Sequence, residues 1–166
     1  MVACSVVLGG LPRTALADAP VADGRVDTWH IGVSGGPFFN DAHSVSAAFA
    51  ATALYHDHEG VFALGGRARI AFPPTTATEV EVAARIYPHA LPLSDYYGLG
   101  LGAGLRWFGS EGVRLGFVPS IEVGIAFRIT RLVFGVGSRF EMFVSDGVRG
   151  SSVYGGPELS LACVLP

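Results

Sequence analysis

Apolar and polar residues alternate along most of the chain from Thr28 onward. Such alternation, with a period of two residues, is typical of β-strands whose two faces meet different environments. Eight segments show it: 28–36, 45–55, 61–72, 79–87, 96–107, 113–127, 132–143 and 153–165. Most of them reach the length of about 9 to 11 residues with which a tilted strand crosses a bilayer. The pattern predicts an all-β chain of about eight strands.

The segments between the predicted strands are short and rich in Gly, Pro, Asp, Asn and Ser, the residues that favour turns. They cover 37–44, 56–60, 73–78, 88–95, 109–112, 128–131 and 145–152. Segments of this length suit hairpins between neighbouring antiparallel strands. With a periplasmic N-terminus, the segments 37–44, 73–78, 109–112 and 145–152 are the predicted extracellular loops.

The two faces of the predicted strands differ sharply in chemistry. One face is almost purely apolar and carries residues such as Leu99, Leu101 and Val123. The opposite face combines small residues with charges of both signs. Its charged residues are Arg67, Arg69, Glu79, Glu81, Arg85, Arg106, Arg114, Glu122, Arg139, Glu141 and Glu158.

Glycines on the polar face indicate which face lies inside. In the segment 96–107 the polar face carries Gly98, Gly100, Gly102 and Gly104 in succession, followed by Arg106. A row of Gly exposed to water would weaken a strand and pack against nothing. Inside an eight-stranded barrel, which side chains just fill, the same row leaves room for long side chains. We therefore expect the charged residues to face the lumen and to interleave as cross-strand ion pairs, because unpaired buried charges are costly.

Aromatic residues provide a second indication, since membrane barrels gather them in belts at both interfaces. Several aromatic residues of the apolar face lie near predicted strand ends. The predicted interfacial belt consists of Trp29, Tyr55, Phe62, Tyr97 and Phe127 near the periplasmic ends, and Phe72 and Trp107 near the opposite ends.

The composition agrees with a membrane location and excludes other classes. The 166 residues fit one domain, and half of them are hydrophobic, with a mean hydropathy of +0.45 and 15% charged residues, against roughly 25% charged in soluble domains. Beyond the first twenty positions no apolar stretch reaches the roughly 20 residues of a membrane-spanning helix. The net charge of −3 without a basic cluster argues against a nucleic-acid partner.

The N-terminal residues suggest export. An apolar run at 2–11 precedes the small residues Ala15 and Ala17, as in a cleavable signal peptide. We expect a signal peptide at 1–17, a short periplasmic segment at 18–27 and the barrel at 28–166, with a lipidated Cys4 as the alternative. After cleavage Cys163 would be the single cysteine, so we expect no disulfide in the mature chain.

Gly-rich strands such as 97–105 (YGLGLGAGL), together with the size, the alternation and the export signal, give residues 28–165 a resemblance to the small OmpA/OmpX-type outer-membrane β-barrels. The resemblance implies a closed antiparallel up-and-down transmembrane β-barrel in a bacterial outer membrane. It also implies outer-membrane lipid and the barrel assembly machinery as partners. Members usually end in Phe or Trp, whereas this chain ends in Leu165 and Pro166. Closure also follows because a sheet edge in hydrocarbon leaves unpaired backbone groups.

Residues of catalytic or metal-binding type are few. The run from His56 to Glu59 has metal-ligand residue types, but lacks a second cluster and is interpreted as a polar turn. We predict no catalytic residue, metal or cofactor. The leading interpretation is a non-enzymatic outer-membrane barrel with a polar, side-chain-filled interior and a structural or surface role. The alternatives are a narrow pore for ions or small solutes and a secreted soluble barrel that binds an apolar ligand.

Overall fold

The computed structural model describes residues 27–40, 44–57, 59–73, 76–89, 91–108, 112–145 and 152–165. The signal peptide predicted at 1–17 and nearly all of the segment 18–27 lie outside the described residues. The strands are β1 (Thr28–Asn40), β2 (Val45–His56), β3 (Phe62–Ala71), β4 (Ala77–Ile86), β5 (Leu93–Trp107), β6 (Val113–Ile129), β7 (Leu132–Phe143) and β8 (Ser152–Leu165). Among the described residues, no helix has the length and apolar character needed to cross a membrane.

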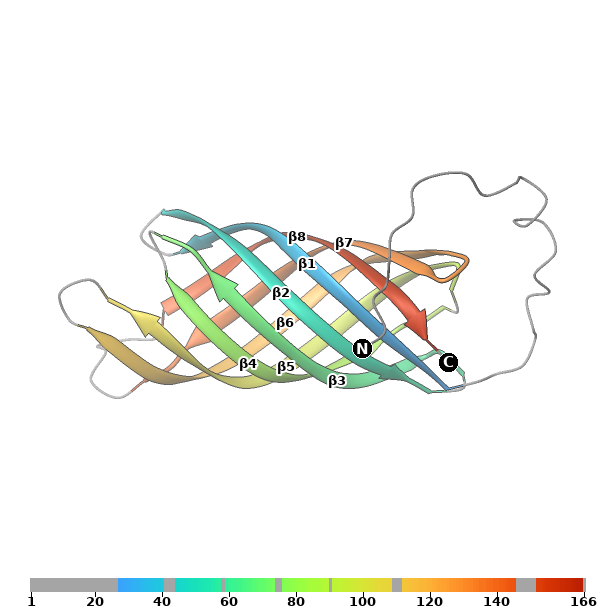
Figure 1. Ribbon diagram of the computed structural model, residues 1–166, viewed down its shortest axis with the longest axis horizontal. Helices are drawn as coiled ribbons and strands as arrows, with labels where there is room; N and C mark the ends of the chain where they lie inside the picture. The colour runs from blue at the N-terminus through green and yellow to red at the C-terminus, as the bar shows by residue number, and fades with distance from the viewer. Residues whose placement is uncertain are drawn as a thin grey trace.

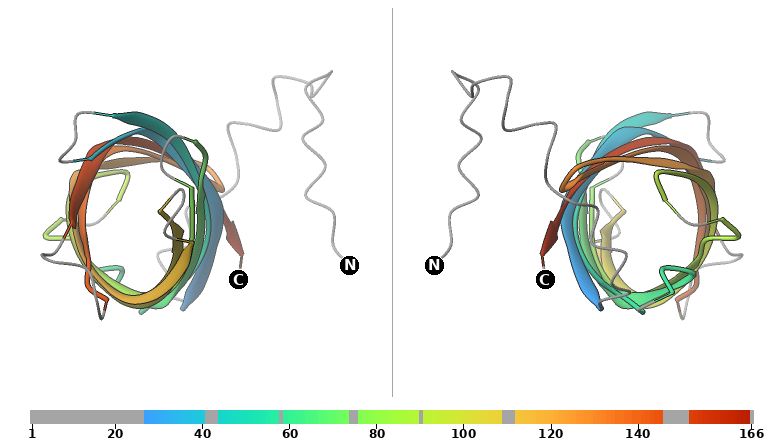
Figure 2. Two further views of the ribbon diagram at one scale, coloured as in Figure 1. Left: turned by 90° about the vertical axis from the view of Figure 1, so that its left-hand side faces the viewer. Right: turned by 90° about the vertical axis from the view of Figure 1, so that its right-hand side faces the viewer.

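Each strand pairs antiparallel with the next one in the chain, and β1 pairs antiparallel with β8. The strands are inclined to the barrel axis (Figure 1) and form a closed ring in the end views (Figure 2). The predicted closed antiparallel up-and-down barrel of eight strands is thus confirmed, including the closure between the first and last strands.

The two ends of the barrel carry different connections. The start of β1 and the end of β8 lie at one end, which we call the terminal end (Figure 1). The turns that follow β2, β4 and β6 lie there too. The connections that follow β1, β3, β5 and β7 lie at the other end, which we call the loop end.

Side chains are distributed inversely to those of a soluble protein. Large apolar side chains cover the outside, where Val80 is 67% and Leu115 is 69% exposed, whereas Arg106 and Glu141 are buried inside. This distribution is the one expected of a barrel whose outer face meets lipid. It contradicts the alternative of a soluble barrel with an apolar interior, because the lumen holds ionic side chains.

Several strands extend further than the sequence predicted. The predicted loop 37–44 is wrong in its first half, because β1 continues to Asn40 and buries Phe38 in the lumen. Pro37 was interpreted as a turn residue, yet it faces outward in the strand and pairs with Ala47 of β2. Likewise β4 begins at Ala77 and β5 at Leu93, inside predicted turns. Turn-forming residues at these positions are accommodated within regular strands.

Prolines interrupt two strand interfaces. Between β1 and β8 the pairing stops after Gly35 and resumes at Phe39, and Pro37 and Pro157 oppose each other in this interval. Between β6 and β7 regular pairing begins at Ser120, next to Pro119. Proline has no N–H to donate to the ladder, so a strand interface that contains it loses hydrogen bonds.

Candidate functional site

The centre of the lumen holds a network of five arginines and five glutamates, contributed by β3 to β8. Its members are Arg67, Arg69, Arg85, Arg106, Arg139, Glu79, Glu81, Glu122, Glu141 and Glu158. Their formal charges cancel. This network is the densest gathering of polar side chains in the described lumen, and we treat it as the candidate site.

Toward the loop end, two arginines share two glutamates. Arg106 Nη2 donates to Glu79 at 2.8 Å and to Glu141 at 2.6 Å. Arg69 Nη1 donates to the same carboxylates, at 3.2 Å and 2.6 Å respectively. These four side chains come from β3, β4, β5 and β7, so the ring of ion pairs ties opposite parts of the barrel wall together.

Toward the terminal end, the pairs centre on Glu122. Its carboxylate accepts hydrogen bonds from Arg85, at 2.5 and 3.0 Å, and from Arg67 at 3.0 Å. Arg67 also lies 3.4 Å from Glu158 and 3.5 Å from Glu81. The Arg67–Glu122 pair joins β3 to β6, which are not neighbours in the sheet.

Arg139 connects the two groups. Its Nη2 donates to Glu81 at 2.5 Å and its Nε donates to Glu141 at 3.2 Å. The Ser120 hydroxyl completes this part by donating to Glu81 at 3.1 Å. The ten charged residues therefore form one continuous network across the lumen.

Burial makes the network energetically demanding. Arg67 and Arg106 are 2% and 1% exposed, and Glu141 is 3% exposed. Removing one member of a buried ion pair typically costs about 3 to 5 kcal/mol, because the remaining charge loses its partner without regaining water. The pairs thus hold one another in place and fix the arrangement of the six strands.

The glycines of β5 leave the space that the network needs. A Cβ at Gly104 would approach Glu79, and one at Gly100 would lie 2.6 Å from a carboxylate oxygen of Glu81. A Cβ at Gly98 would collide with the side chain of Glu122. Close approach of long side chains to this strand therefore requires glycine.

An aromatic layer covers the network at the loop end. The Arg106 guanidinium lies 3.7 Å from the ring centroid of Tyr154 and 4.6 Å from that of Phe143. Arg69 lies 3.8 Å from the ring of Phe38, which stacks on Tyr154. Cations placed over aromatic faces are attracted by the ring quadrupole, so this layer stabilises the charges below it.

A second layer of aromatic side chains lies toward the terminal end. His30 and His56 stack with ring centroids 3.5 Å apart, and Tyr87 lies 5.1 Å from His56. Tyr96 follows at 5.9 Å from Tyr87 and lies under the Arg85 guanidinium. The sequence interpretation placed His56 in a polar turn, whereas it points into the lumen at the end of β2. The inward alternation of Leu54 and His56 was the signal that could have revealed this.

Arg114 is the remaining charged residue that the sequence predicted to face the lumen. Arg114 is half-buried at the loop end of β6, with its guanidinium 5.9 Å from the ring of Phe108. In the part of the chain that the structure describes, no group of three or more His, Cys, Asp or Glu is placed to hold a metal ion.

The aromatic residues predicted to form the interfacial belt all lie on the outer face. Trp29 packs edge-on against Tyr55 at the terminal end, and Phe127 stacks on Phe134 there. At the loop end Phe72 packs against Phe49. All seven predicted belt residues are exposed, with exposed fractions of 37 to 51%: Trp29, Tyr55, Phe62, Phe72, Tyr97, Trp107 and Phe127.

Comparisons with known proteins identify related folds only. No family model matches the chain, and no curated protein sequence matches it. Among solved structures it is similar to Neisserial surface protein A (NspA), with 12% identity and a TM-score of 0.62 over 82% of this chain and 96% of that one. The N-terminal β-barrel domain of Pseudomonas aeruginosa OprF is similar at 12% identity and a TM-score of 0.56, over 81% and 96% of the two chains. The likeness shows a shared eight-stranded barrel fold, the one that the resemblance to small OmpA/OmpX-type barrels predicted.

Proposed function

We propose that this chain is a non-enzymatic barrel of a bacterial outer membrane that serves as a structural or surface component and keeps its lumen closed. The observation that carries the proposal is the filled lumen, in which a neutral ionic network lies between two aromatic layers. The neighbour NspA is described as a surface protein, which is in line with such a role.

The outer surface supports a membrane location. Its apolar side chains extend around the barrel, from Val33 of β1 through Leu101 of β5 to Leu159 of β8, and each of these three is more than 60% exposed. Exposed apolar patches of this extent are unstable in water. Hydrocarbon around the barrel removes that cost, and the closed ladder leaves no strand edge to be satisfied by water.

The packing of the lumen favours a closed scaffold over a narrow pore. Two cavities that touch the interior measure about 10 and 20 Å³, about the size needed for a single water molecule. An ion crossing the lumen would also have to part pairs such as Arg106–Glu141 at 2.6 Å. These small cavities and close ion pairs support a closed lumen over a continuous aqueous path.

Conductance in planar bilayers tests the proposal. Purified barrel, whose folding is verified by heat-modifiable migration on a detergent gel, is added to a bilayer under an applied voltage. We expect insertion without discrete current steps. Reproducible single-channel steps from the folded protein would contradict the closed lumen and support the pore instead.

A further inference from the structure

The interface between β1 and β8 is weakened at one place by a pair of prolines. Pro37 and Pro157 oppose each other where pairing stops, and neither can donate a ladder hydrogen bond. A Cβ on Gly36 would collide with the carbonyl oxygen of Pro157, and a Cβ on Gly156 would collide with that of Pro37. The strands approach closely here only because these two residues are glycines.

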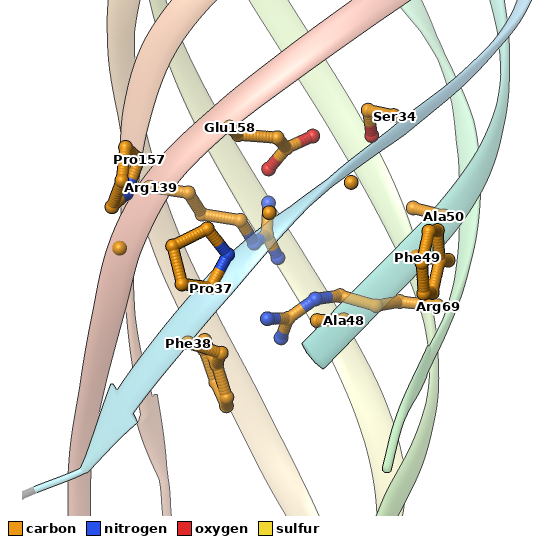
Figure 3. A pocket seen from close by; sticks show the side chains of 13 residues that line it. Ser34, Pro37, Phe38, Ala48, Phe49, Ala50, Arg69, Arg139, Pro157 and Glu158 are labelled. Carbon is orange, nitrogen blue, oxygen red and sulfur yellow. The ribbon is translucent and has the colours of Figure 1, made fainter. Parts of the chain in front are cut away.

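A small pocket of about 10 Å³ lies at this break, and three members of the ionic network are among its lining residues (Figure 3). The exposed residues Phe49 and Pro157 line it together with the buried Arg69 and Arg139 and with Glu158. The side chain of Glu158 is 15% exposed, against 0 to 5% for the other four glutamates of the network. Glu158, the least buried glutamate of the network, thus lies beside the break.

Ser34 marks the pocket as a polar site. Its residue is 6% exposed, and its hydroxyl has no hydrogen-bond partner among the described residues although it is buried. It lines the pocket together with Arg69 and Arg139 (Figure 3). A buried hydroxyl without a partner is unfavourable unless a bound group satisfies it.

An apolar groove of about 930 Å³ on the outer face continues from this pocket and shares Ser34, Gly35 and Phe49 with it. The groove exists because outward positions on neighbouring strands are small, namely Gly35, Ala51 and Ala68. Larger side chains flank it. They are Val33, Phe49, Ile70, Phe134, Leu159 and Leu161.

We propose that this groove binds one phospholipid of the surrounding bilayer, with an acyl chain in the groove and a single phosphate or ester oxygen in the pocket. The oxygen accepts hydrogen bonds from the Ser34 hydroxyl and from the guanidinium groups that line the pocket. Arg69 and Arg139 line the pocket as hydrogen-bond donors, and an uncharged ester oxygen is compatible with the Glu158 carboxylate beside them. The pocket's volume admits one oxygen and no complete headgroup. The site rests on the proposed membrane location.

Photo-cross-linking tests the site. The full barrel is reconstituted in vesicles of phosphatidylethanolamine and phosphatidylglycerol with a trace of phosphatidylglycerol that carries a diazirine on its acyl chain. Cross-linked residues are then quantified by mass spectrometry. We expect groove residues to exceed residues of the far outer face, around Leu101, by about fivefold, the effect of one net hydrogen bond.

Three variants sharpen the result. Ser34→Ala and Ala51→Phe should each reduce labelling of the groove to the level of the far face, because the first removes the donor and the second fills the groove. Ala103→Phe adds the same bulk on the exposed face of β5 and should leave groove labelling unchanged.

The outcomes separate the site from the membrane barrel. Labelling that is uniform around the outer face, or unaffected by Ser34→Ala and Ala51→Phe, overturns the lipid site and leaves the membrane location intact. Groove labelling below that of the far face, in barrels that migrate as dimers on a native detergent gel, assigns the groove to a second chain and also overturns the proposal. Absence of lipid labelling on every outward residue overturns the membrane location, and the site with it.

Discussion

Substituting Glu122 by Gln tests how strongly the ionic network holds the barrel together. Glu122 accepts three hydrogen bonds from two arginines, at 2.5 to 3.0 Å. Gln keeps the shape but removes the charge and turns an N–H₂ group toward arginine donors. Arg85, whose guanidinium is otherwise placed over the ring of Tyr96, loses its carboxylate. We expect a loss of about 3 to 5 kcal/mol in the free energy of unfolding.

Glu158→Gln is the matched control in the same network. Glu158 is in contact with Arg67 at 3.4 Å, and Arg67 retains Glu81 and Glu122 as partners. The charge change is identical, but every arginine of the network keeps at least one carboxylate partner among the described residues. We expect a loss of about 1 kcal/mol, the value of one ordinary hydrogen bond.

Urea unfolding in lipid vesicles is followed by tryptophan fluorescence, and linear extrapolation gives the free energy of unfolding of each variant. The chain has two tryptophans, Trp29 and Trp107, which lie on the outer face near opposite ends. Adding Arg85→Met to Glu122→Gln should cost less than the sum of the two single changes, because charge balance is restored. If Glu122→Gln destabilises the barrel no more than Glu158→Gln does, the reasoning on paired burial is wrong.

The lumen allows two further predictions, both read from unfolding curves. Gly100→Val places carbon atoms against the carboxylate of Glu81 and should lower the free energy of unfolding by about 1 to 3 kcal/mol. The control Ala103→Val, on the outer face of the same strand, should change it by less than about 0.5 kcal/mol. Equal effects of the two changes would contradict the tight packing around β5. His56→Phe should cost less than about 1.5 kcal/mol, because the ring can still stack on His30 and the Nε2 atom that is lost has no described partner. A larger loss would indicate a hydrogen bond that the packing does not reveal.

The strands could be predicted from the sequence because one face is apolar and exposed and the other lines a packed lumen, which imposes a strict alternation of side chains. Strand ends were less predictable, since residues such as Pro37 and Asp95 favour turns locally but lie within strands here. The closed ladder and the packing of neighbouring strands override the local preference. The N–H that Pro37 lacks leaves a local break in the ladder with β8, where pairing resumes at Phe39.

The members of the ionic network could be predicted from the sequence more readily than the pairs that they form. Arg67 and Glu81 oppose each other on adjacent strands, so simple alternation and hairpin pairing bring them together. The pair Arg67–Glu122 spans 55 residues and crosses the lumen, and it depends on the barrel's diameter and stagger. Patterns along a single sequence do not contain those quantities. The His30–His56 stack was missed because His56 was assigned to a turn.

The most direct test of the barrel with a polar lumen and an apolar outer face uses nitroxide labels on pairs of consecutive residues in two strands. Single-cysteine variants are made at Val82 and Ala83 of β4 and at Ser120 and Ile121 of β6, after replacement of Cys163. In lipid vesicles, we expect labels at Val82 and Ile121 to be accessible to oxygen and shielded from a water-soluble nickel chelate, because these side chains face outward. Labels at Ala83 and Ser120 should be shielded from both. Oxygen accessibility that is high at the inward positions and low at the outward ones would contradict the account.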